Sequence, residues 1–146
     1  MFIEQLSTAG SGPALSAMLR FAGQRQRLIA HNIANFDTPN FRPADVSPQR
    51  FQDQLASAID ERRARTGGGS GALNLRSTRE VGIGEGGELR LAPLTPSRNV
   101  MFHDRNNRDL ERTMQKLVEN ASMYRVASEL LSSRSNLIGG AIAERV

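Results

Sequence analysis

The 146-residue sequence predicts a mainly α-helical protein in which long helices at the two ends of the chain pair as a coiled coil. Apolar residues recur at alternating steps of three and four in both end segments, which is the repeat of paired helices. Glycine and proline gather between those segments. Only 38% of the residues are hydrophobic, which suits one domain with a modest core.

These patterns divide the chain into three parts. We expect an N-terminal core helix within residues 1–36 and a C-terminal core helix within residues 107–146. The middle segment, residues 37–106, should contain a turn, a short helix, a glycine-rich linker and a small irregular or β-hairpin segment.

The C-terminal segment, from Asn107 to about Ala143, carries the strongest repeat. Its apolar residues keep heptad spacing over roughly five heptads, interrupted by Ser128 and Ser135. We call this series the seam, and its large members are Leu110, Met114, Leu117, Tyr124, Leu131, Ile138 and Ile142. The spacing predicts one helix of about 35 residues that packs against another helix.

A second apolar series, called the stripe below, runs beside the seam. It consists of Met123, Val126, Leu130, Leu137 and Ala141. Seam and stripe together form a face too wide for a two-stranded pair, so this helix needs at least two partners.

The first partner is the N-terminal helix, which we expect from Pro13 to Asn35, roughly 35 Å long. Its apolar residues again keep heptad spacing, as Leu15, Leu19, Ala22, Ile29, Ile33 and Phe36. Because this helix is about two-thirds as long as the C-terminal one, it cannot cover both the seam and the stripe.

The middle segment has its own local signals. Ser47 is a candidate N-cap and Pro48 a first helical residue, before a narrow stripe of Phe51, Leu55, Ala58 and Ile59. Arginines at 62, 63 and 65 suit the negative end of that helix's dipole and its solvation. Residues 67–71 read as a flexible linker. Short alternations at residues 73–75 and 89–91 predict a small hairpin, with residues 82–87 between the strands.

Composition argues against several function classes. The net charge is +4, but acidic and basic residues alternate along the chain, so we expect no nucleic-acid partner. The sequence has no cysteine, and His31 and His103 lack the spacing of metal ligands. Without a catalytic signature we expect no enzyme, no cofactor or metal, and no small-molecule substrate. A helical nucleic-acid-binding regulator and an enzyme of unknown type remain as alternatives.

The end of the N-terminal helix carries a distinctive string. Thr38 precedes Pro39 and is therefore pushed out of the helical region, so the string is locally a helix cap and a turn. As a whole it resembles the N-terminal signature of the bacterial flagellar axial proteins (rod, hook and hook-associated), matched here by Asn32, Asn35, Thr38, Pro39 and Phe41. Asn40 stands where that family usually has glycine, and asparagine is the next-best residue for a positive φ.

The chain length and the C-terminal sequence indicate which group of axial proteins the chain resembles most. Only about 70 residues separate Phe36 from Asn107, whereas the longer axial proteins carry inserted domains there. Asn106 and Asn107, ahead of the last helix, and residues 130–134 resemble the B-type proximal rod proteins. The resemblance covers residues 13–41 and 104–143 well and the middle only by length. A C-type proximal rod protein or another short axial protein is the alternative.

The resemblance implies a structural subunit of the flagellar proximal rod, or drive shaft, that self-assembles through its terminal helices at the base of the basal body. Implied partners are further copies of itself, the C-type and other rod proteins, and the export-gate/MS-ring adaptor protein. It also implies a periplasmic rod location, reached through the flagellar type III system without a cleaved signal peptide; the N-terminus lacks the basic-then-apolar pattern of such a signal. In this reading the seam is an assembly surface and the stripe meets neighbouring subunits.

Overall fold

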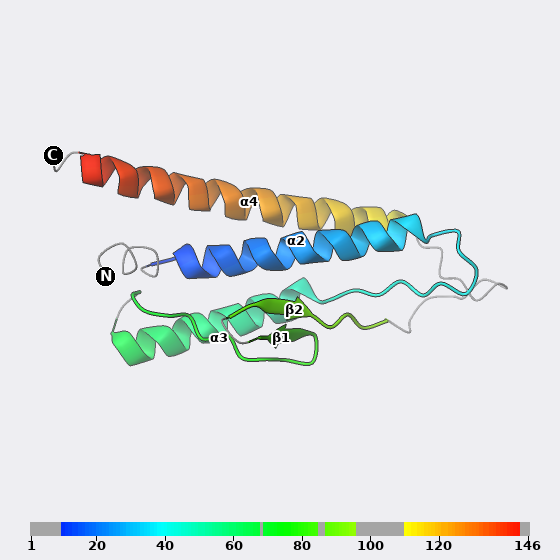
Figure 1. The fold of residues 1–146 in the computed structure, drawn as a ribbon, viewed down its shortest axis with the longest axis horizontal. Coiled ribbons are helices and arrows are strands. Elements are labelled where there is room, and N and C mark those ends of the chain that lie inside the picture. Colours follow the sequence, from blue (N-terminus) through cyan, green and yellow to red (C-terminus); the bar gives the residue numbers. More distant parts are fainter. Residues whose placement is uncertain (1–9, 68, 85–86, 96–109, 144–146) are drawn as a thin grey trace.

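The computed structural model describes residues 10–67, 69–84, 87–95 and 110–143. Its elements are helices α2 (Gly12–Ala34), α3 (Pro48–Thr66) and α4 (Leu110–Ala143), and strands β1 (Val81–Ile83) and β2 (Leu89–Leu91). Figure 1 shows three layers: α4 lies on one side of α2, and α3 with the β-hairpin lies on the other. The expected mainly α-helical fold with a small hairpin is confirmed.

The terminal helices pack side by side and run antiparallel (Figure 1). Asn120, in the first third of α4, donates hydrogen bonds from Nδ2 to Ala22 O at 2.9 Å and to Gln26 Oε1 at 2.8 Å, near the middle of α2. Toward the end of α4, the Arg134 guanidinium lies beside Gly10, so close that a Cβ added there would be 2.7 Å from Nη1. The two terminal helices thus pack against each other, and their pairing as a coiled coil stays a prediction.

Local signals fix the helix ends. α2 begins one residue before Pro13 and ends one residue before Asn35, close to the expected bounds. At the start of α3, Ser47 Oγ accepts a hydrogen bond from Arg50 N at 3.3 Å, so the predicted N-cap is confirmed. Gly67 ends α3 with φ of 66°, a left-handed cap that glycine adopts without strain. Residues 107–109, expected to begin the last helix, lie outside the described residues.

The hydrophobic core lies between α2, α3 and the hairpin. At its centre the rings of Phe21 and Phe51 stack with centroids 4.1 Å apart and an interplanar angle of 4°. The other buried members come from α2, from α3 and the residue before its N-cap, and from the hairpin: Ala14, Ala17, Val46, Leu55, Val81 and Leu89. The narrow apolar face predicted for α3 is confirmed: Phe51, Leu55 and Ala58 are buried, and Ile59 is half-buried and packs on the core. α4 adds only Met123 to this core, so most of its surface faces away.

The predicted hairpin was wrong in its first strand. Leu91 pairs with Val81 and Leu89 with Ile83, whereas Leu73 and Leu75 lie outside the sheet and pack on the core as half-buried residues. The glycines misled the prediction, because Gly82 lies within β1 opposite Arg90 rather than in the turn. The shorter loop closes by a hydrogen bond from Gly84 N to Glu88 O at 2.8 Å.

Arg62 also departs from expectation. Arg63 and Arg65 are exposed, as solvation at the end of α3 requires, but only 3% of Arg62 is exposed. Its Nη2 donates to Gly10 O at 2.8 Å, and Gly10 N donates to Gly69 O at 2.6 Å. Arg62 therefore ties the start of α2 to the end of α3 instead of serving as a solvated partner of the helix dipole.

Candidate assembly surface

The turn after α2 brings the motif residues together as a clasp. Asn32 is buried, and its side chain exchanges two hydrogen bonds with the backbone of Ala44: Nδ2 donates to O at 2.7 Å and Oδ1 accepts from N at 3.3 Å. Asn35 caps the helix by donating from Nδ2 to His31 O at 2.9 Å. These bonds end α2 and direct the chain back along it.

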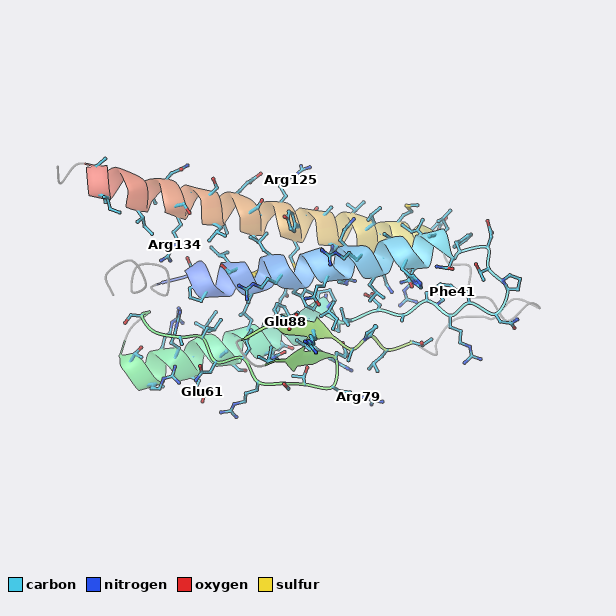
Figure 2. All side chains as sticks on the ribbon, viewed as in Figure 1. Phe41, Glu61, Arg79, Glu88, Arg125 and Arg134 are labelled. Atoms are coloured by element: carbon cyan, nitrogen blue, oxygen red, sulfur yellow. The ribbon has the colours of Figure 1, made fainter. Side chains whose placement is uncertain are left out.

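The second half of the motif forms the turn itself. Thr38 N donates to Asn35 O at 3.0 Å, and Phe41 N donates to Thr38 O at 3.2 Å, with the exposed Pro39 between them. Asn40 has φ of 61°, so the conformation expected for the residue that replaces glycine is confirmed. The Phe41 ring, labelled in Figure 2, lies 5.6 Å from the His31 ring. The motif residues are therefore structural residues of one helix end.

An ion-pair cluster that the sequence analysis did not identify joins three parts of the chain at Asp45. Its carboxylate accepts two hydrogen bonds of 3.0 Å from Arg25 of α2, and a 3.0 Å bond from Lys116 of α4. The backbone of Asp45 also pairs with Leu94 through two hydrogen bonds. No spacing rule links residues 25, 45 and 116, so only the folded arrangement reveals the cluster.

The electrostatics of this cluster follow from its burial. Burial alone would raise the pKa of Asp45, but hydrogen bonds from Arg25 and Lys116, and their charges, outweigh that effect and hold the pKa below its ordinary value of 3.8. Only 2% of the Arg25 side chain is exposed, compared with 14% for Asp45. The buried guanidinium therefore depends on this carboxylate for its charge balance.

A hollow of about 570 Å³ lies beside Asp45, between the start of α3 and the first half of α4. Its charged walls are already partnered: Glu80 accepts hydrogen bonds from Arg50 and from Ser47 N, the latter at 2.7 Å. Within the described ranges, histidines and carboxylates nowhere gather in a group of three that could hold a metal ion. The ion pairs along the walls of this hollow hold α2, α3, α4 and the segments between them together.

The face that α4 turns toward α2 differs from the predicted seam. Its fully buried residues are Asn120 and Ala127, one position before Ala121 and Ser128, which occupy heptad positions of the seam. Small side chains explain the shift, because Ala127 and Ala22, both fully buried, let the two helices approach closely. Apolar residues lie on both sides of this line, so the heptad repeat alone could not indicate which side docks.

The seam lies along one edge of the contact with α2. Leu117, Leu131 and Ile138 are half-buried. The other large members are exposed by between 41% and 51%: Leu110, Met114, Tyr124 and Ile142. The seam is thus partly covered within the subunit and partly available to another molecule.

The stripe lies along the other edge. Met123 is half-buried and packs against the core. Val126, Leu130 and Leu137 are exposed by 53%, 52% and 73%, and Ala141 is exposed as well. Val118, which belongs to neither the seam nor the stripe, is exposed by 64%. In the described part of the chain, every exposed large hydrophobic residue belongs to α4. These exposed apolar side chains make α4 the candidate interaction surface.

None of the helices among the described residues combines the length and the apolar character needed to cross a lipid bilayer. Charged residues interrupt the apolar positions of α4, among them Lys116, Arg125 and Glu129. Its exposed apolar edges alternate with polar residues, which suits contact with other protein helices.

Comparison with known proteins points to one family. No protein-family model matches the chain. The chain is 33% identical over 105 residues to the flagellar basal body rod protein FlgB of Borrelia hermsii, a match that covers 68% of this chain and 71% of that protein. It is 30% identical over 118 residues to the FlgB protein of Yersinia enterocolitica, covering 80% and 81%. The FlgB protein of Salmonella typhimurium is 28% identical over 134 residues, covering 82% and 88%.

These matches span more than two thirds of this chain and of each relative. The chain belongs to the FlgB family of flagellar basal body rod proteins.

Proposed function

We propose that this protein is a structural subunit of the flagellar proximal rod and that it self-assembles through α2 and α4 at the base of the basal body. The observation that carries the proposal is the distribution of exposed apolar residues. All eight large hydrophobic side chains exposed in the described part of the chain lie on α4. The FlgB name of the relatives favours the B-type over the C-type rod protein.

We assign a separate structural role in the rod to each of the three parts of the chain. Residues 1–36 and 107–146 form the assembling core, and residues 37–106 form the outward-facing segment. The Asp45 cluster and the clasp at Asn32 supply the rigid connection between these parts, because both hold the middle segment to α2. A rod that transmits torque needs such connections within each subunit.

The proposal extends to partners and to location. Besides further copies of itself, the subunit contacts the C-type and other rod proteins and the export-gate/MS-ring adaptor protein. It occupies the periplasmic rod, which it reaches through the flagellar type III apparatus without a cleaved signal. Its role is mechanical and involves no catalysis.

The test is complementation of a strain that lacks this gene. The unmodified chain restores swimming and basal bodies with complete rods, whereas Leu137→Asp restores neither. Leu137 is 73% exposed, so the substitution changes the stability of the free subunit by no more than about 0.5 kcal/mol. In the assembled rod it removes roughly 2 kcal/mol of apolar burial at each contact and buries a charge.

The matched control is Ala56→Asp, which places the same charge on the exposed side of α3. This variant keeps swimming, because α3 belongs to the outward-facing segment. Normal swimming of the deletion strain would contradict the rod function, and normal swimming with Leu137→Asp would contradict assembly through α4.

A further inference from the structure

A groove of about 640 Å³ runs between α2 and α4 on the side of the seam. We call it the α2–α4 groove. Its walls carry the small residues Gly23, Ala121 and Ser128, the half-exposed ring of Tyr124, and two arginines, Arg27 and Arg125. A Cβ added at Gly23 would meet nothing within 4 Å, so this wall of the groove is open. Small residues of this kind admit a ridge of side chains from another helix.

The opposite edge of α4 presents such a ridge. We call it the α4 ridge, formed by Val126, Leu130 and Leu137. The α-helix turns by about 100° per residue, so Tyr124 in the groove and Val126 on the ridge point to opposite sides of α4. Glu129 and Leu137 line one shallow hollow, so a carboxylate lies next to the ridge.

The charges of the two surfaces are complementary. Arg27, Arg125 and Glu129 are exposed, and among the described residues they form no ion pair within the subunit. Figure 2 shows Arg125 on the outer side of α4. Arg125 and Glu129 are four residues apart, or about 6 Å along the helix axis. A neighbour displaced by about one helical turn would bring its Glu129 opposite Arg125.

We propose that the α4 ridge of one copy of this chain inserts into the α2–α4 groove of the next copy, with Glu129 of the ridge paired to Arg125 of the groove. The contact joins two different surfaces, so a pair of copies still has one free groove and one free ridge, and the array grows as an open helix rather than closing as a dimer. This inference rests on the proposed rod function and specifies which surfaces of α4 meet.

Disulfide crosslinking tests the contact, because the chain has no cysteine of its own. In the register set by residues 125 and 129, Ser128 of the groove faces Ser133 beside the ridge. The double variant Ser128→Cys/Ser133→Cys is expressed in the deletion strain, and basal bodies are oxidised and examined on non-reducing gels. A ladder of dimers and higher oligomers supports the proposal. Each single variant should give no ladder.

Two outcomes would overturn the contact. Dimers formed by Ser128→Cys alone would mean that groove meets groove in a symmetric pair. Swimming cells whose rods contain the double variant without crosslinks would mean that the ridge lies elsewhere, although the rod function would stand. If the deletion strain swims without the chain, the rod function itself fails, so the two failures can be distinguished.

A charge exchange provides the second measurement. Arg125→Glu reduces swimming to that of the deletion strain, because Glu129 of the next copy is then repelled. Adding Glu129→Arg to the same chain restores swimming, since every contact again joins opposite charges. A double variant that swims no better than Arg125→Glu would contradict the pairing.

Discussion

Replacement of Asp45 by asparagine removes the carboxylate that neutralises Arg25, and the structure allows its consequence to be worked out. The Arg25 side chain is 2% exposed, and both of its hydrogen bonds to Asp45 measure 3.0 Å. Asparagine has nearly the same shape but presents one acceptor instead of two, and no charge. An uncompensated buried guanidinium destabilises a protein by about 3–5 kcal/mol.

The expected loss lies at the lower end of that range, about 3 kcal/mol, because Asp45 is 14% exposed and Lys116 is 28% exposed. Domains of this size are stable by roughly 5–15 kcal/mol in total, so the effect is large. Urea unfolding at pH 7, followed by far-ultraviolet circular dichroism, measures it. The matched control is Asp53→Asn on the exposed side of α3, which should change the free energy of unfolding by less than about 0.5 kcal/mol.

The pH dependence of the same pair has a definite sign. Because the pKa of Asp45 is lowered in the folded state, the unfolded chain binds a proton at this group more readily as the pH falls. The stabilisation by Asp45 is therefore fully present above about pH 4, where the group ionises in the unfolded chain, and is lost as the pH falls through the lower folded pKa. The difference between the unmodified protein and Asp45→Asn should shrink as the pH falls below about 4. A difference below about 0.5 kcal/mol at pH 7, or one that does not change with pH, would refute the assignment of this ion pair.

Three further substitutions test local features by urea unfolding. Asn32→Ala removes both hydrogen bonds to the backbone of Ala44 and should cost about 1–3 kcal/mol; an unchanged midpoint would contradict the clasp. Asn40→Val should cost about 1–2 kcal/mol more than Asn40→Gly, because φ is 61° there, and equal effects would be inconsistent with the left-handed turn. Gly67→Ala should cost about 1 kcal/mol and speed amide exchange in the last turn of α3, since φ is 66°; slower exchange would exclude a strained cap.

Local signals in the sequence predicted the helix ends closely, because each depends on residues within one turn. Pro13, the Ser47-Pro48 pair and the Thr38-Pro39 pair act on their own backbone, whatever the rest of the chain does. The same holds for Asn40, whose positive φ was expected from its place in the motif.

Features that depend on distant parts of the chain were missed. Arg62 is buried because Gly10, 52 residues away, supplies a carbonyl group. Asp45 was missed because its ion-pair partners, Arg25 of α2 and Lys116 of α4, come close to it only in the folded chain. The wrong strand at residues 73–75 has the same origin, since its alternation reflects packing on the core rather than pairing.

The candidate surface was predicted in composition but not in orientation. Both apolar edges of α4 could be identified from spacing, yet Asn120 and Ala127 between them decide where α2 docks. Those two positions carry no hydrophobic signal of their own. The expected roles of seam and stripe in contacts between subunits stay predictions.

The antiparallel pairing of α2 and α4 joins segments of this helical protein that lie far apart in the sequence. The hydrogen bond from Asn120 to Ala22 spans 98 residues, and Figure 1 shows the first and last helices of the chain lying side by side. Closing a loop of that length costs about 4 kcal/mol of chain entropy before any contact offsets it. Helical proteins usually fold quickly because their contacts are local, but here the last segment of the chain must find the first. The pairing of α2 with α4 is therefore expected to form late in folding, after the core around Phe21 and Phe51.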